Sequence, residues 1–175
     1  VYFLLNKPRG VVSTVSDEKG RKTVVDFIDT DERIYPVGRL DYDTTGLLIL
    51  TNDGDLANKL THPKNKIIKT YLAKCAGIIT KEQIDKLKKG IYIDDRKVDI
   101  IDFKVKKIDK EKNATFISIS IIEGRNHIVK RLFESIGLLV DKLTRTHYDF
   151  LDLGNLKSGE YRTLSIKEVK KLYRN

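Results

Sequence analysis

The chain has 175 residues, and its 34 Lys and Arg against 25 Asp and Glu give a net charge of +9. This length can bury a core as one ordinary domain or two small lobes, so folding requires neither a disulfide nor a metal. The single cysteine excludes an internal disulfide framework and a cysteine-based metal cluster. The basic surplus indicates a polyanionic partner, either nucleic acid or an anionic membrane surface. An ordinary lysine-rich solvated surface would account for the charge equally well.

The first half of the chain predicts strands separated by short helices. Helical patterns cover 23–28 and 55–62, the second stopping before Pro63. Strand patterns cover 1–7, 33–40 (interrupted by Pro36), 47–51 and 69–77.

The second half predicts three helices and further strands. A helix over 80–90 opens with the capping box Thr80/Gln83, and a helix over 165–175 opens with Ser165/Glu168. Between them we expect a hairpin-rich region over 91–109, strands over 114–122 and 138–145, and an amphipathic helix over 126–137. Strands outnumber helices and occur in runs with hairpin signals. The chain is therefore predicted to be one α+β domain, residues 1–175, with a mixed, largely antiparallel sheet.

Several kinds of catalytic site lack support in the sequence. The three histidines are far apart and show no metal-ligand spacing, so no metal site is expected. Asp41 and Asp43 lie in one turn, whereas the paired carboxylates of glycosidases come from separate elements. GxSxG, Walker and GxGxxG sequences are all absent. An enzyme of this sequence would have to use a lone carboxylate, cations and aromatic side chains.

Five segments, in order, resemble the motifs of RNA pseudouridine synthases, in the branch that modifies single sites in ribosomal RNA. The signature motif of that family matches GRLDYDTTGLLILTNDG at 38–54. The other four segments are NKPRG (6–10), KTYLA (69–73), EGRNHIVKRLFESIG (123–137) and LTRTHYDFLDLGNLKSGEYRTLS (143–165). The resemblance implies the pseudouridine synthase fold, with flanking helices on the central sheet and a central active-site cleft.

The resemblance also implies a reaction and its principal residues. The uridine N1–C1′ bond breaks, the uracil turns, and C5 rejoins the sugar, without a metal, nucleotide or redox cofactor. Asp41 matches the nucleophile, which must stay ionised, and Lys130 matches the cation placed against it to lower its pKa. Tyr71 matches the tyrosine that stacks on the target base.

Further basic residues match positions expected to contact RNA. Arg39 corresponds to an arginine that approaches the RNA where the base is extruded. Lys7 and Arg125 are expected to bind substrate, and Arg9 and Arg145 to line the same cleft or contact phosphate.

The overall likeness favours large-subunit ribosomal RNA, with small-subunit RNA as the alternative. A non-catalytic ribosome assembly factor is a second reading, but it predicts the loss of Asp41 or Tyr71, and both are present. A metal-dependent nuclease would need clustered carboxylates. We expect a cytoplasmic monomer that acts on ribosomal RNA or a pre-ribosomal particle, with no membrane partner. The resemblance also implies a small RNA-binding domain of the S4 kind ahead of this point, and a chain that begins with Val1 and contains no Met is expected to lack it.

Overall fold

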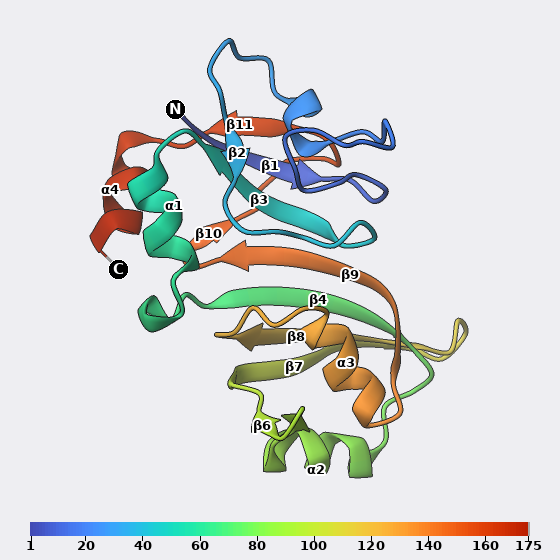
Figure 1. The fold of residues 1–175 in the computed structure, drawn as a ribbon. Helices are drawn as coiled ribbons and strands as arrows, with labels where there is room; N and C mark the ends of the chain where they lie inside the picture. Colours follow the sequence, from blue (N-terminus) through green and yellow to red (C-terminus); the bar gives the residue numbers. More distant parts are fainter. Residues whose placement is uncertain (175) are drawn as a thin grey trace. The chain divides into compact units, whose positions relative to one another are not determined.

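The computed structural model describes residues 1–174, which form two compact units (Figure 1). Unit 1 consists of residues 1–67 and the C-terminal segment from Thr146, and unit 2 consists of residues 68–145. Each unit has its own hydrophobic core. Among the described residues, every helix is too short or too polar to cross a membrane.

Unit 1 is built on short strands with two helices beside them. Its strands are β1 (Tyr2–Lys7), β2 (Tyr35–Pro36), β3 (Thr45–Thr51), β10 (Leu151–Asp152) and β11 (Tyr161–Thr163). Its helices are α1 (Gly54–Thr61) and α4 (Ile166–Arg174), with 3-10 turns at η1 (Val24–Phe27) and η2 (Pro63–Asn65). β1 pairs antiparallel with both β3 and β11, and β2 pairs antiparallel with β3.

The apolar run predicted as a buried strand forms β3, whose residues 46–51 are all buried. Its alternate residues Leu47 and Ile49 face α1, where Leu56 and Leu60 join the same cluster as Leu172 of α4. Apolar side chains on both faces of β3 explain why the run is continuous rather than alternating. The strand that carries the signature motif into the core is thus held on both sides.

Asp53 ties the two helices of unit 1 together. Its carboxylate accepts a hydrogen bond from the Leu56 amide at 3.1 Å and so caps α1. The same carboxylate accepts hydrogen bonds from the hydroxyls of Tyr2 and Tyr173, the second of which lies near the end of α4. Figure 1 shows α1 and α4 side by side.

The strand predicted over 33–40 is much shorter than expected. Tyr35 and Pro36 pair with β3, opposite Thr51 and Leu50, and the Val37 amide donates to the Ile49 carbonyl at 2.7 Å. Proline has no amide proton to donate, and Gly38 two residues later has φ +72°, which turns the chain out of the sheet. The residues from Gly38 onward therefore form a loop that leads to β3.

Unit 2 is an antiparallel sheet with helices on one face. Its strands are β4 (Lys69–Ala76), β5 (Tyr92–Ile93), β6 (Arg96–Lys97), β7 (Ile100–Asp109), β8 (Ala114–Ile121) and most of β9 (Leu139–Tyr148). Its helices are α2 (Lys81–Lys89) and α3 (Ile128–Ser135). β8 pairs with β4 on one side and with β7 on the other, and β5 and β6 form a separate hairpin.

One face of this sheet packs on α2 and α3. Ile117, Ile119 and Ile121 of β8 are completely buried and join Leu132 and Phe133 of α3 in one cluster. Their period-2 spacing is the alternation that predicted a half-buried strand.

Several sequence predictions for unit 2 are confirmed. The capping box of Thr80 and Gln83 opens α2, and Gly90 follows its last residue with φ +114°. The predicted hairpin region contains β5, β6 and β7. Cys75 is buried on β4, and burial raises the pKa of its thiol to about 12, which keeps it protonated and unreactive.

Phe133 is the largest apolar side chain of α3 and is completely buried. Replacing it with alanine leaves a cavity among the β8 isoleucines, and we expect Phe133→Ala to lower the free energy of unfolding by about 3–5 kcal/mol. Urea unfolding followed by circular dichroism measures the change. Glu134→Ala, at the next and exposed position of the same helix, should change stability by less than about 0.5 kcal/mol. Equal effects of the two substitutions would contradict the packing described for α3.

Candidate active site

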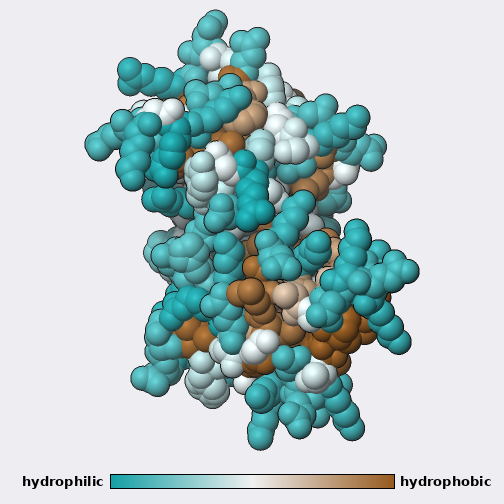
Figure 2. All heavy atoms as spheres, turned by 90° about the vertical axis from the view of Figure 1, so that its right-hand side faces the viewer, coloured by the Kyte–Doolittle hydropathy of each residue, from teal (hydrophilic) through white to brown (hydrophobic). Residues whose placement is uncertain are grey.

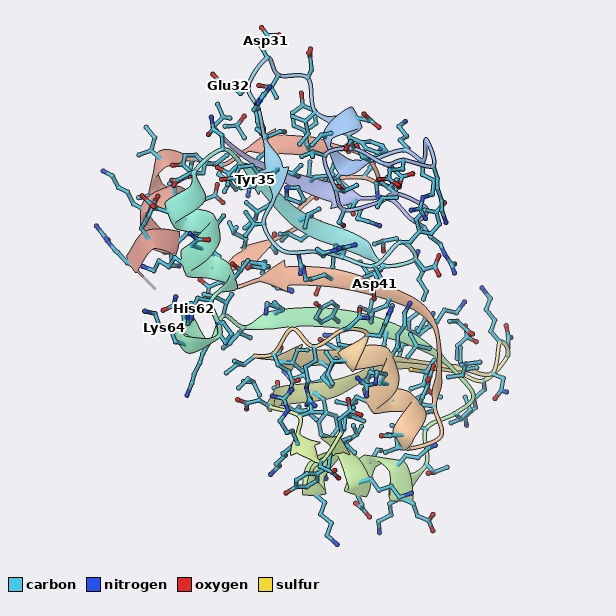
Figure 3. All side chains as sticks on the ribbon, viewed as in Figure 1. Asp31, Glu32, Tyr35, Asp41, His62 and Lys64 are labelled. Carbon is cyan, nitrogen blue, oxygen red and sulfur yellow. The ribbon has the colours of Figure 1, made fainter. Side chains whose placement is uncertain are left out.

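Asp41 lies on the loop that enters β3, and Figure 3 labels it there. The loop turns at this residue, because the Thr44 amide donates to the Asp41 carbonyl at 3.0 Å. Asp41 itself is half-buried, whereas Tyr42 and Asp43 are exposed. The side chain of the predicted nucleophile is therefore neither free in solvent nor sealed in the core.

Ser13 fixes the residue just before Asp41. The Leu40 amide donates to the Ser13 hydroxyl at 3.1 Å, and that hydroxyl donates to the Leu40 carbonyl at 2.8 Å. Ser13 is 5% exposed and the Leu40 side chain is buried. This role could not be predicted from the sequence, because a serine 27 residues away shares no motif with Leu40.

Lys7 fixes the residues after Asp41. Its ammonium group donates to the carbonyls of Thr44 at 2.7 Å, Pro8 at 3.0 Å and Tyr42 at 3.3 Å. Lys7 has no exposed surface. An ammonium has three protons, so these three carbonyls match its donors. Two of them belong to the loop that carries Asp41.

The expectation that Lys7 binds substrate stays a prediction. For its ammonium to reach a phosphate, the hydrogen bonds to three main-chain carbonyls would have to open. Its charge still acts nearby: burial lowers the pKa of Lys7 to about 8, while the carboxylates of Asp41 and Asp43 oppose that shift. Lys7 thus holds the loop of Asp41 through the carbonyls of Tyr42 and Thr44.

Arg39 is exposed on the same loop, two residues before Asp41. This exposure is what a contact with RNA requires, and the contact itself stays a prediction. Arg9 is also exposed and lies 3.9 Å from Asp43, a separation typical of a weak, solvent-screened ion pair.

The remaining predicted site residues belong to unit 2. Tyr71 is half-buried on β4, opposite Ile119, on the face that packs against the helices. Lys130 is half-buried in the first turn of α3. Its neighbour Arg131 donates to Asp94, in the turn between β5 and β6, at 2.5 Å.

Lys69 is a basic residue that sequence reasoning missed. It lies two residues before Tyr71, opposite Ile121, and therefore on the same face of β4. Burial lowers the pKa of its ammonium to about 8, and the nearby charge of Arg145 lowers it further. Arg145 is 3% exposed, and its expected place in the cleft or against phosphate stays a prediction. The alternation in KTYLA, which puts Lys69 and Tyr71 on one face, was the signal available.

Arg125 is already bound to other groups of unit 2. Its guanidinium pairs with Glu123, and its Nη1 donates to the Ile93 carbonyl at 2.6 Å. These bonds connect the segment before α3 to the β5–β6 hairpin. A phosphate would have to compete with these bonds, and the contact of Arg125 with RNA stays a prediction.

Within residues 1–174, His, Cys, Asp and Glu nowhere gather in a group of three or more that could hold a metal ion. The arrangement around Asp41 instead offers a fixed carboxylate with exposed cations near it in unit 1. Unit 2 offers Tyr71, the half-buried Lys69 on the same strand and the buried Arg145 on β9. Such groups can attack, stack and stabilise charge by themselves.

Comparison with known proteins identifies the family. The sequence model of the RNA pseudouridylate synthase family matches residues 1–135. The chain is 53% identical over 173 residues to the ribosomal large subunit pseudouridine synthase B of Bacillus subtilis (strain 168), covering 98% of this chain and 71% of that protein. An uncharacterized RNA pseudouridine synthase of Aquifex aeolicus (strain VF5) is 39% identical over 175 residues, which is 99% of this chain and 70% of that one.

The fold agrees with these matches. A crystal structure of a pseudouridylate synthase superimposes with a TM-score of 0.82 at 34% identity, covering 98% of this chain and 73% of the other. The chain therefore belongs to the RNA pseudouridine synthase family and is an isomerase that converts uridine to pseudouridine in RNA. The predicted α+β fold, with a mostly antiparallel sheet and flanking helices, is confirmed.

The buried ammonium of Lys7 gives a stability prediction. Lys7→Met removes the donor from three carbonyls of a packed loop, and we expect the free energy of unfolding at pH 7 to fall by about 2 kcal/mol or more. Arg9→Gln, which removes an exposed cation two residues away, should change it by less than about 0.5 kcal/mol. Urea titrations of both variants beside the parent measure the difference. A Lys7→Met chain as stable as the parent would contradict the anchoring role.

The lowered pKa of Lys7 also gives a pH dependence. The ammonium titrates near pH 8 in the folded chain and near its ordinary value of 10.5 when unfolded. Between these values the unfolded chain binds more protons at this group, so its contribution to stability rises with pH. We expect the stability difference between the parent and Lys7→Met to grow from pH 8 to pH 10, by at most about 1.4 kcal/mol per pH unit. A difference that shrinks over this range would show that the folded-state pKa is not lowered.

Proposed function

We propose that the chain isomerises a uridine of large-subunit ribosomal RNA and that Asp41 is its nucleophile. The observation that carries the substrate is the 53% identity, over 98% of the chain, to a synthase named for the large ribosomal subunit. The observation that supports Asp41 as the nucleophile is the anchoring of its loop. Ser13 holds the residue before Asp41, and Lys7 holds the residues after it.

In this proposal, both units form one catalytic domain that works in the cytoplasm on ribosomal RNA or a pre-ribosomal particle. Tyr71 stacks on the target base and Arg39 meets the RNA where that base leaves its stack. The role of Lys130, to keep the nucleophile ionised, stays a prediction.

The chemical balance of the reaction fits the residues present. The carboxylate of Asp41 attacks, the N1–C1′ bond breaks, and the uracil is held while it turns. A C5–C1′ bond then forms, the bond to Asp41 breaks and restores its carboxylate, C5 loses its proton, and N1 gains one. Product and substrate have the same formula, so the overall reaction consumes no oxidant and no second substrate.

A fixed loop favours this chemistry because an attacking carboxylate must be close and correctly aimed. Effective molarities of well-oriented groups are large, and a displacement of about 1 Å costs on the order of 100-fold in rate. Hydrogen bonds on both sides of Asp41 restrict its main chain before substrate arrives. Its half-buried position also limits the water around the carboxylate.

The test is to map pseudouridine by chemical labelling on large-subunit and small-subunit transcripts after incubation with the protein. We expect Asp41→Asn to lower turnover by at least about 1,000-fold while RNA affinity stays within about twofold, because the carboxylate acts in the reaction and attracts no phosphate. Asp43→Asn is the matched control, since its side chain is 56% exposed and it lies in the same turn. It should keep near-parental activity.

The outcomes separate the alternatives. Modification of the large-subunit transcript alone supports the proposed substrate, and modification of the small-subunit transcript alone would replace it. Full activity of Asp41→Asn would refute the nucleophile. Binding of RNA without any pseudouridine would favour a non-catalytic assembly factor, whereas RNA cleavage abolished by EDTA would favour a metal-dependent nuclease.

A further inference from the structure

Tyr42 displays an aromatic ring next to the predicted nucleophile. Its main chain is fixed, because its carbonyl accepts hydrogen bonds from the Gly10 amide at 2.9 Å and from Lys7 at 3.3 Å. Its side chain is nevertheless 45% exposed. A large side chain held at its backbone and left open at its ring is preorganised for contact with a ligand.

One cation already lies over this ring. The Cζ atom of Arg21 is 5.5 Å from the ring centroid of Tyr42, within the range of a cation–π interaction. Arg21 comes from the segment between β1 and η1, 21 residues earlier in the chain. The ring and the guanidinium therefore meet by folding and not by sequence proximity.

Asp17 holds Arg21 in this place. Its carboxylate accepts hydrogen bonds from Arg21 Nε at 3.0 Å and Nη2 at 2.9 Å, and from the Arg21 amide at 2.8 Å. In this side-on pairing, Nη1 lies on the other edge of the guanidinium plane, directed away from the carboxylate. The N–H groups on that edge can donate to a phosphate oxygen.

The surroundings of the pair are polar and open. Asp43, which follows Tyr42, is exposed, as is Arg9, which lies 3.9 Å from Asp43. The face of unit 1 seen in Figure 2 is largely hydrophilic. Gly10 packs against the end of the tyrosine: a Cβ at Gly10 would lie 3.6 Å from the Tyr42 hydroxyl. The ring is thus supported at one end and covered by one cation, without being buried.

We propose that Tyr42 and Arg21 form a binding platform for an RNA nucleotide that neighbours the target uridine. The base stacks on the ring of Tyr42, and its phosphate contacts the Nη1 edge of Arg21. Tyr42 directly follows Asp41, and the Cα atoms of consecutive residues lie about 3.8 Å apart. A nucleotide on Tyr42 is therefore a near neighbour of the nucleotide that Asp41 attacks. The inference rests on the proposed function, in which Asp41 is the nucleophile.

The physical need for such a platform follows from base extrusion. A nucleotide taken out of its stack leaves neighbours that have lost a stacking partner. Single-stranded RNA is bound by aromatic rings that replace this stacking and by cations that follow the backbone. A tyrosine and an arginine held together beside the reacting carboxylate supply both groups.

The experiment measures binding by fluorescence anisotropy in an Asp41→Asn background, where no turnover interferes. The probes are single-stranded octauridylate and the same ribose-phosphate chain without bases. We expect Tyr42→Ala and Tyr42→Leu to bind octauridylate at least about fivefold more weakly and to bind the abasic chain as the Asp41→Asn parent does. Tyr42→Phe should bind both probes as that parent does.

Two further variants complete the design. Arg21→Gln should weaken binding of both probes and reduce the slope of log affinity against log salt by about 1, because it removes a phosphate contact. Tyr92→Ala, which removes a tyrosine that is 66% exposed in unit 2, is the matched control and should change neither probe. Thermal unfolding of each variant confirms that it is folded.

The result that overturns the platform is equal affinity of folded Tyr42→Leu and its parent for octauridylate, or an equal loss on both probes. The first would mean that no base stacks there, and the second that the residue acts only on the fold. Neither result depends on pseudouridine formation. Failure of the platform and failure of the proposed reaction are therefore distinguishable.

Discussion

The buried ammonium of Lys7 is the contact on which the geometry around Asp41 depends. It ends β1 and meets the carbonyls of Pro8, Tyr42 and Thr44, so it joins the first strand to the loop of the nucleophile. Burying a cation is expensive, and the lowered pKa of Lys7 shows that cost. The three hydrogen bonds to carbonyls, which no apolar side chain could make, offset this cost.

The same anchoring separates two functions within one short loop. The main chain from Leu40 to Thr44 is held by Ser13, Lys7 and the amide of Gly10. The side chains of the loop are left for chemistry and recognition, with Asp41 half-buried and Tyr42 exposed. A rigid backbone with open side chains is the arrangement expected of a preorganised site. Asp41 and the proposed nucleotide platform thus share one support.

Much of the fold could be predicted from the sequence because its local signals agree with one another. Capping residues located α2 and α4, alternation located β8, and a continuous apolar run located β3. The strand predicted over 33–40 is too long, because Pro36 lacks an amide proton and Gly38 turns the chain out of the sheet. Ordered motifs likewise identified the family, because five matching segments constrain a chain far more than any one.

The environment of the charged residues could not be predicted in the same way. Lys7, Arg125 and Arg145 appear in the sequence as basic residues of a basic chain, which usually lie in solvent. The structure instead buries Lys7 and Arg145 and occupies Arg125 with Glu123. These positions depend on carbonyls and carboxylates that folding brings close to each cation. The partners are far away in the sequence, so no local pattern predicts the contacts.

The most direct test is the single-turnover rate of pseudouridine formation by Lys7→Met at saturating large-subunit transcript, measured together with RNA affinity. If Lys7 aims the nucleophile, the rate should fall by about 100-fold or more while affinity stays within about twofold. A parental rate in the folded variant would show that the loop is positioned without Lys7. A loss of affinity at an unchanged rate would show that Lys7 contacts RNA, as the sequence alone suggested.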